Sequence, residues 1–262
     1  MLEVEHLRKV YGGHGRSVEA IRDLTFQIHA GELVCLVGPS GCGKTTLLKC
    51  ISGLLEPTSG RTLLEGRPVL GPPANMAVVL QEYGRSLFPW MNVAANVDLP
   101  LREKRLPKTR RRELVESALA AVGLADAGTA YPWQLSGGMQ QRVAIARALA
   151  YEPHILLMDE PFAAVDAQTR ADLEDLIRRI WADFSMTILF VTHDIDEAVY
   201  LGQRVLVLST SPTVVQEDLA IDLPADRDQL TTRSDTRFTK LRGHVYEQIQ
   251  QAKTAGSART NA

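Results

Sequence analysis

The sequence predicts an α/β protein built on a mainly parallel sheet, and three observations support this fold. Five short apolar runs rich in β-branched residues recur along the chain, with helix-like segments between them. An alternating apolar and polar stretch precedes the first run, and a long helical stretch interrupts the series. Continuous apolar strands separated by helices are typical of a parallel sheet covered on both faces. A chain of 262 residues is long enough to bury such a core.

The strands are expected in the following order. LEVEHLRKVY and AIRDLTFQIHAG alternate apolar and polar residues, which predicts a half-exposed antiparallel sheet flanking the first core strand. The core strands are expected at LVCLV (33–37), MAVVL (76–80), ILLMD (155–159), TILFVT (187–192) and RVLVLS (204–209). After them we expect a closing hairpin at TVVQEDLAIDL, an amphipathic helix at FTKLRGHVYEQIQ and a frayed polar tail, AGSARTNA.

The segment between Gln81 and Ser136 has a helical pattern, since LVESALAAVGL repeats apolar residues at three-to-four spacing. We therefore expect a helical subdomain inserted into a single domain. The core and its β-subdomain are expected at 1–81 and 152–235, the helical subdomain at about 82–151, and a C-terminal helix and tail at about 236–262. The basic run REKRLPKTRRRE (102–113) is expected to be a solvated helix face, with a membrane-proximal role as the alternative.

Composition excludes several classes of protein. The net charge of −2 leaves no general basic field for nucleic acid, so no nucleic-acid partner is expected. The apolar runs are of strand length, whereas a spanning helix needs about 20 apolar residues, and the N-terminus lacks a signal-peptide pattern. Cys35, Cys42 and Cys50 show no CxxC spacing, which favours a reducing compartment and small apolar filler over a disulfide or zinc site.

The stretch GPSGCGKTT (38–46) matches the phosphate-loop pattern G-x-x-x-x-G-K-[ST] between an expected strand and an expected helix. Gly38, Gly41 and Gly43 let successive N–H groups point at phosphate oxygens, and the helix N-terminus adds partial positive charge. Lys44 is expected to neutralise the β and γ phosphates of a nucleotide, and the Thr45 hydroxyl to bind Mg²⁺. The other residues of this nucleotide-binding loop are Pro39, Ser40, Cys42 and Thr46. A glycine-rich turn with an incidental lysine is the alternative.

Polar residues follow three of the expected core strands. Asp159 and Glu160 end ILLMDE, where Asp159 suits Mg²⁺, directly or through water, and Glu160 suits accepting a proton from an attacking water. The alternative is that both acids cap a helix before Pro161. His193 follows TILFVT and favours a γ-phosphate contact over simple packing. Gln81 follows MAVVL and could touch Mg²⁺ or orient water.

A second glycine motif, LSGGMQQR (135–142), precedes a long helix pattern with apolar positions 143, 145, 146 and 149. Ser136 is a plausible N-cap, so the hydroxyl, the N–H groups and the helix dipole would offer another anion site. Local chemistry alone favours a plain helix start.

Taken in order, Tyr11, GPSGCGKTT, Gln81, LSGGMQQR, ILLMDEPFAAVD and TH (192–193) resemble the nucleotide-binding subunit of ATP-binding cassette (ABC) transporters from about residue 2 to 210. LSGG is the signature of that family. The resemblance implies that two subunits pair head to tail, as a homodimer or with a related ATPase subunit. Ser136, Gly137, Gly138 and Asp166 of one subunit would then act in trans on the ATP of the other.

The resemblance also implies individual roles. Tyr11 would stack on adenine, with local packing of an edge-strand tyrosine as the alternative. Gln81 would sense Mg²⁺ and link the site to the membrane subunits, Glu160 would be the base, and His193 would hold the γ-phosphate. One departure is that Ala163, Ala164, Val165 and Asp166 stand where the family commonly has serine-alanine-leucine-aspartate, which puts a cross-subunit serine hydrogen bond in doubt.

The stretch EYGRSLFPWMNVAANVDLPL (82–101) places Leu87, Phe88, Trp90 and Met91 in an expected exposed loop. Such a cluster favours docking, here of the short coupling helix of an integral membrane permease, over packing within the helical subdomain. The FPW sequence (88–90) is most similar to that of the nitrate, sulfonate and taurine branch of ABC importers. Cys42, beside a helix N-terminus and Lys44, is expected to be a reactive thiol that bound ATP protects from alkylation.

The sequence thus predicts an ATPase that energises an importer and works with Mg²⁺ on the cytoplasmic face of the inner membrane, as a peripheral protein. A substrate-binding protein would be an indirect partner. The alternatives are a soluble ABC protein of the translation or DNA-repair kind, an importer subunit for another small solute, and a P-loop kinase.

Overall fold

The computed structural model describes every residue except 14–15, 82–85, 164 and 261–262. The chain divides into two compact units. The first unit consists of Met1–Pro73 and Ser185–Ala262, and the second of Ala74–Phe184.

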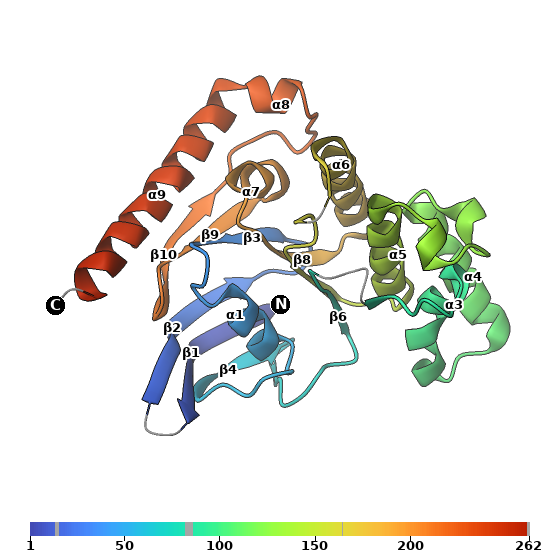
Figure 1. Cartoon of the computed structure of the whole chain (residues 1–262), viewed down its shortest axis with the longest axis horizontal. Coiled ribbons are helices and arrows are strands. Elements are labelled where there is room, and N and C mark those ends of the chain that lie inside the picture. The colour runs from blue at the N-terminus through green and yellow to red at the C-terminus, as the bar shows by residue number, and fades with distance from the viewer. Residues whose placement is uncertain (14–15, 82–85, 164, 261–262) are drawn as a thin grey trace. The chain divides into compact units, whose positions relative to one another are not determined.

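The first unit holds a large sheet, with helices between its later strands (Figure 1). Its strands are β1 (Leu2–Gly13), β2 (Arg16–Ile28), β3 (Leu33–Val37), β4 (Ser59–Leu64), β5 (Arg67–Pro68), β8 (Thr187–Val191), β9 (Arg204–Leu208) and β10 (Thr213–Ala220). Its helices are α1 (Lys44–Ile51), α7 (Ile195–Leu201), α8 (Thr231–Ser234) and α9 (Thr236–Thr260).

Within this unit the strand order is β5-β4-β1-β2-β10-β9-β3-β8. β3 pairs in parallel with β8 and β9, while β1 pairs antiparallel with β2 and β4. The expectation that the antiparallel sheet flanks the first core strand is wrong, because β9 and β10 lie between β2 and β3. The closing hairpin expected within TVVQEDLAIDL is wrong, because most of this segment forms one strand, β10, which pairs antiparallel with β9 and in parallel with β2.

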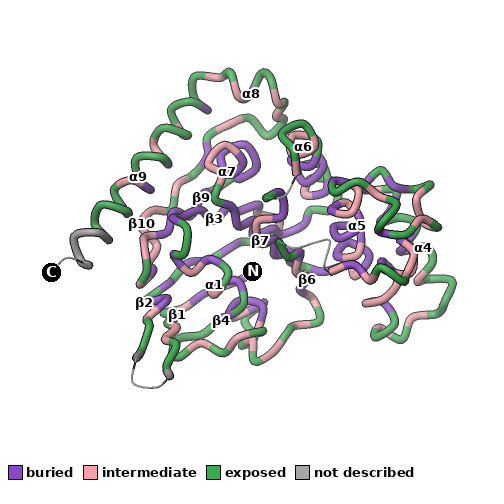
Figure 2. Tube along the Cα trace, viewed as in Figure 1, coloured by how far each residue is buried: buried purple, intermediate pink, exposed green. Residues whose placement is uncertain are grey.

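The core of the first unit lies around β3, β8 and β9. All five residues of β3 and of β8 are buried, as are four of the five residues of β9 (Figure 2). Strands that bury both faces read as continuous apolar runs, which is why the sequence marks them so clearly. The expected α/β class is confirmed.

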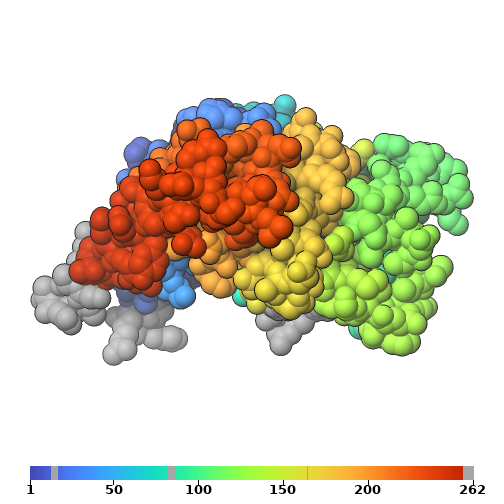
Figure 3. Space-filling view, turned by 90° about the horizontal axis from the view of Figure 1, so that it is seen from above, coloured from blue at the N-terminus to red at the C-terminus, as the bar shows by residue number. Residues whose placement is uncertain are grey.

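The C-terminal helix is longer than expected. α9 runs from Thr236 to Thr260, so the segment 255–260, expected to be part of a frayed tail, continues the helix, and 261–262 lie outside the described residues. Its buried side chains, Phe238, Val245, Ile249 and Ala252, recur at helical spacing. α9 packs against α7, β9 and β10 and covers part of the surface of this unit (Figure 3).

The second unit is mainly helical. Its strands are the parallel pair β6 (Met76–Val79) and β7 (Ile155–Asp159). Its helices are α3 (Val93–Asp98), α4 (Lys108–Ala121), α5 (Gly137–Ala150) and α6 (Ala167–Phe184), with short 3₁₀ turns η1 (Leu99–Lys104), η2 (Ala125–Ala127) and η3 (Pro132–Gln134). α5 packs against α3, α4, α6 and β6. The helical pattern between 82 and 151 therefore corresponds to α3, α4 and α5.

Candidate nucleotide site

The phosphate-binding pattern forms a loop between β3 and α1 in the first unit. Gly41 (φ 74°) and Gly43 (φ 101°) adopt left-handed conformations that side chains disfavour. At Gly38 the reason is space, since a Cβ there would lie 2.9 Å from the Leu208 Cβ on β9. The loop can turn sharply and present N–H groups because these positions are glycine.

Two buried side chains hold the loop. The Lys44 ammonium donates to the carbonyl oxygens of Gly38 (3.1 Å) and Pro39 (3.4 Å). The hydroxyl of Thr213, at the start of β10, donates to the carbonyl oxygen of Cys42. Nothing in the sequence marks Thr213, because it lies 171 residues from Cys42 along the chain and belongs to no motif.

Tyr11, near the end of β1, is 43% exposed, and its hydroxyl lies 3.2 Å from the Thr46 hydroxyl in α1. The ring is therefore connected to the helix that follows the phosphate loop, and the Lys9 ammonium lies over it, 5.5 Å from the ring centroid. An exposed aromatic ring at this position can stack on a base. Because Tyr11 also has local contacts with Lys9 and Thr46, its stacking on adenine stays a prediction.

His193 emerges at the same edge of the sheet as the phosphate loop. β3 and β8 are neighbouring parallel strands, with Leu36 opposite Val191, so their carboxyl ends meet at one edge. The His193 side chain is exposed. It lines a hollow of about 590 Å³ formed by the start of α7 and by α9, including Asp196 and Arg242. Arg242 and Asp196 form an ion pair of 3.7 Å across it.

In the second unit, Gln81 and Glu160 come together at the carboxyl ends of β6 and β7. The Gln81 amide nitrogen donates to the Glu160 carboxylate at 3.5 Å. Asp159, one residue earlier, is buried, and Glu160 has a positive φ of 44°. The alternative that both acids cap a helix at Pro161 is wrong, because the next helix, α6, begins at Ala167.

The second glycine motif begins α5 as expected. Ser136 is the N-cap, and its hydroxyl accepts a hydrogen bond of 3.3 Å from the Met139 N–H. Ser136 and Gly137 are exposed, whereas Gly138 is buried. A Cβ on Gly138 would lie 2.3 Å from the Thr169 Cγ2 of α6, so any other residue there would have to displace Thr169.

Thr169 also fixes Asp166. Its N–H and hydroxyl donate to the two carboxylate oxygens of Asp166 at 3.0 and 2.7 Å. Hydrogen bonds from the Thr169 N–H and then from its hydroxyl lower the pKa of the Asp166 carboxyl below its usual value. Ala163, which stands where the family commonly has serine, is exposed. The next residue, Ala164, lies outside the described residues.

The expected docking cluster is only partly exposed. Leu87 is 3% exposed, so its expected surface position is wrong: it packs in the interior of the helical segment. Phe88 and Met91 are half-buried, while Trp90 is 70% exposed and lies 5.3 Å from the Phe88 ring between centroids. Trp90 therefore provides most of the exposed apolar surface of this cluster, and Phe88 and Met91 add to it in part.

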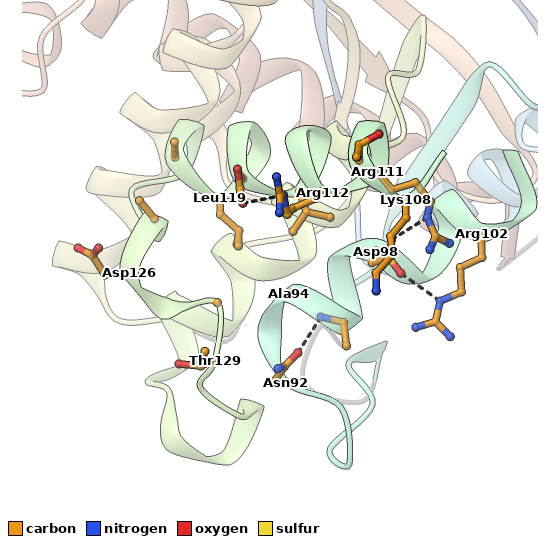
Figure 4. A pocket seen from close by; sticks show the side chains of 17 residues that line it. Asn92, Ala94, Asp98, Arg102, Lys108, Arg111, Arg112, Leu119, Asp126 and Thr129 are labelled. Atoms are coloured by element: carbon orange, nitrogen blue, oxygen red, sulfur yellow. Dashed lines mark hydrogen bonds and ion pairs between the residues drawn. The ribbon is translucent and has the colours of Figure 1, made fainter. Parts of the chain in front are cut away.

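A larger hollow of about 1030 Å³ begins just beyond this segment, between α3 and α4 (Figure 4). Its floor is apolar and includes Val115 and Leu119. Its charged lining consists of four cations, Arg102, Lys108, Arg111 and Arg112, and three carboxylates, Asp98, Glu116 and Asp126. Asp98 lies between Arg102 (3.1 Å) and Arg111 (3.4 Å). Four side chains of the basic run thus line a hollow, whereas the run was expected to form a solvated helix face.

The expected reactivity of Cys42 does not agree with its position. Its side chain is 1% exposed, so an alkylating reagent cannot reach it in this conformation. Cys35 and Cys50 are buried as well, and burial raises the pKa of the Cys50 thiol to about 11. All three cysteines are packing residues, as the filler interpretation predicts.

The residues expected to hold Mg²⁺ suit that ion chemically. Thr45 is exposed at the start of α1, and it, Gln81 and Asp159 offer hydroxyl, amide and carboxylate oxygens. Mg²⁺ prefers oxygen ligands and usually takes only one or two from protein, with the rest from phosphate and water. Among the described residues, no group of three or more His, Cys, Asp or Glu side chains is placed to hold a metal alone.

The sequence profile of the ABC transporter family matches residues 21–163. An uncharacterised ABC transporter ATP-binding protein of Methanocaldococcus jannaschii is 49% identical, over 93% of this chain and 89% of its own. The nitrate import ATP-binding protein NrtD of Synechocystis is 46% identical, over 89% and 87% of the two chains. The taurine import ATP-binding protein TauB of Shigella boydii is 40% identical, over 98% and 100%.

Solved structures resemble the chain as well. A dimeric ATP-binding cassette in a post-hydrolysis state, bound to ADP and Pi, superposes with a TM-score of 0.75 at 30% identity, covering 86% of this chain and 100% of its own. The protein cbiO1 of Clostridium perfringens, part of the ABC transporter complex cbiONQ, superposes with a TM-score of 0.75 at 28% identity, covering 83% of this chain and 87% of its own.

Proposed function

Because this chain belongs to the ABC transporter family, we propose that it is the ATP-hydrolysing subunit of an importer for a small anion. Relatives named for nitrate import and taurine import support the substrate class, since both cargoes carry an anionic group. The phosphate loop at Gly38–Gly43, with its two left-handed glycines and Lys44, carries the proposal for ATP.

In the proposed mechanism the loop N–H groups and Lys44 hold the β and γ phosphates of ATP, and Tyr11 stacks on adenine. Thr45, Gln81 and Asp159 would hold Mg²⁺, which neutralises phosphate charge when bound. Glu160 accepts a proton from the water that attacks the γ-phosphorus, and the bond to the β-γ bridging oxygen breaks. Gln81 orients the Glu160 carboxylate through its amide, and His193 donates to a γ-phosphate oxygen.

The signature segment Ser136–Gly138 is proposed to serve the ATP of a second subunit. Its exposed serine and first glycine stand at the N-terminus of the 14-residue helix α5, where N–H groups and the helix dipole attract anions. One similar cassette is dimeric in two solved structures, which supports pairing of two copies or of this chain with a related subunit.

We place the permease contact on Trp90 and the adjoining hollow between α3 and α4. The hollow combines an apolar floor with an excess of cations, which suits a short amphipathic helix that carries acidic residues. Arg111 and Arg102 already share the single carboxylate of Asp98, so an acidic side chain from a partner would find unmatched positive charge. None of the described helices is long and apolar enough to cross a membrane. By analogy with the import subunits it resembles, we propose that the permease anchors the chain at the cytoplasmic face, with a substrate-binding protein as an indirect partner.

The decisive experiment for the ATPase is Glu160→Gln. The variant should lose turnover by at least about 100-fold while it still binds ATP, because only the base is removed. With ATP and Mg²⁺ it should accumulate as a nucleotide-bound dimer, measured by light scattering after size exclusion. Phosphate release at the wild-type rate would refute the role of Glu160. Purifying the native complex and identifying the ligand of its binding protein would test the anion class.

A further inference from the structure

Two adjacent glutamines of α5 have opposite surroundings. Gln140 donates through Nε2 to the carbonyl oxygens of Pro132 (3.0 Å) and Leu135 (3.2 Å). Gln141 is 0% exposed, and within the described part of the chain neither its Nε2 nor its Oε1 has a hydrogen-bond partner. A buried amide that makes no hydrogen bond destabilises the conformation that contains it.

The position of Gln141 links it to the signature segment. Residues three and four apart share a helix face, so Gln141 lies on the face of Gly137 and Gly138, one turn further along α5. Helical side chains lean toward the N-terminus of their helix, which brings this amide toward the turn that carries Ser136. On this face Gly138 lies against Thr169 of α6. A small shift of α5 past α6 would therefore change the neighbours of the amide.

We infer that Gln141 is a positioning residue for the signature segment, whose amide gains its hydrogen bonds only when α5 shifts as Ser136–Gly138 close on the ATP of a second subunit. The inference rests on the proposed function. The unpaired amide raises the free energy of the present conformation, and the paired amide lowers that of the closed one. ATP then needs less differential affinity to drive closure, because the free-energy difference between the two conformations is smaller than it would be with an apolar side chain at this position.

Gln141→Met tests this role, because methionine keeps the length and helix propensity of glutamine and removes both polar atoms. Without nucleotide, the melting temperature should rise by about 4 °C, since a buried unpaired amide is removed. In a Glu160→Gln background, ATP-dependent dimerisation should weaken by at least about tenfold, measured by analytical ultracentrifugation. In the background with Glu160 intact, kcat should fall, while ATP affinity of the monomer stays as in the wild type.

Gln140→Met is the matched control. Its amide is already paired, so this substitution should lower the melting temperature. A Gln141→Met variant that melts higher and still dimerises like its parent would overturn the inference. The amide would then destabilise the fold without any effect on dimerisation. A lower melting temperature would overturn it too, since the amide would already be paired. If the Glu160→Gln parent itself fails to dimerise with ATP, the proposed function fails first, and the inference falls with it.

Discussion

The Gln81 side-chain amide donates a hydrogen bond of 3.5 Å to the Glu160 carboxylate, and this contact joins the ends of the neighbouring parallel strands β6 and β7. A carboxylate that acts as a base must point at the water it deprotonates, and a neighbouring donor limits its rotation. The amide therefore links Gln81, just after β6, to the carboxylate that we propose as the base. A displacement of Gln81 should change the orientation of that carboxylate.

Gln81→Ala should therefore lower kcat by about tenfold to 100-fold and leave the dissociation constant of ATP within about twofold. Phosphate release gives kcat, and a fluorescent ATP analogue gives the affinity. Gln168→Ala, at an exposed glutamine of α6, is the control and should change neither value. Equal rates for Gln81→Ala and wild type would show that Glu160 is oriented by other groups.

Gly138 is expected to be needed for packing as well as for nucleotide. Gly138→Ala would place a Cβ 2.3 Å from the Thr169 Cγ2, which should cost about 1–3 kcal/mol of stability in a chemical denaturation experiment. Adding Thr169→Ser removes that methyl group and keeps the hydroxyl that binds Asp166, so it should restore most of the loss.

The ATPase rate of the double variant then separates the two reasons for the glycine. If stability returns and activity stays low, the main chain at 138 must approach a ligand closely. If both return, packing against Thr169 explains the residue, and the role in trans belongs to Ser136 and Gly137.

Thr213 provides a third prediction. Thr213→Val removes the hydroxyl that binds the Cys42 carbonyl, so it should destabilise the protein by about 1–3 kcal/mol and weaken ATP binding. Thr62→Val is a matched control, because the Thr62 hydroxyl is buried without a partner among the described residues. That control should be neutral or stabilising in thermal unfolding. A Thr213→Val protein as stable as Thr62→Val would mean that the phosphate loop keeps its shape without this bond.

The sequence predicted the family, the α/β class and the core strands, because each rests on local information. Strands such as β3 and β8 are continuous apolar runs, and the glycines of the phosphate loop stand next to the strand and helix they join. The prediction that Ser136 is an N-cap also rests on local information, because its hydroxyl accepts a hydrogen bond from Met139, three residues further along the chain. These predictions needed no knowledge of distant residues.

What the sequence did not reveal depends on long-range contacts. The insertion of β9 and β10 between β2 and β3 is fixed by pairing between segments that are far apart along the chain. Thr213 and Thr169 carry no motif, and their importance lies in the groups they meet, Cys42 and Gly138. Leu87 and Cys42 were placed wrongly for the same reason, since neighbours in sequence do not determine which side of a turn is buried.

The last prediction concerns the docking surface, and it is tested in two ways, by reversing charge and by adding bulk. Lys108→Glu reverses an exposed charge in the hollow between α3 and α4 and should weaken retention of the chain by its permease by about tenfold. Arg105→Glu is the charge control, since Arg105 belongs to the same basic run and is exposed but does not line the hollow. Pull-down from detergent extracts of the native complex would measure retention.

In the shape arm, Ala120→Trp fills the hollow from an exposed position on α4, and Ser117→Trp adds the same bulk to that helix outside the hollow. A partner helix seated between α3 and α4 cannot tolerate the first change, whereas the second leaves its path open. Both variants should keep the ATPase activity of the isolated subunit, because neither residue belongs to the nucleotide site. Loss of retention in Lys108→Glu and Ala120→Trp alone would locate the partner in the hollow. Equal retention in all four variants would instead limit the contact to Trp90 and its neighbours, because that is the part of the proposed docking surface that none of the four substitutions changes.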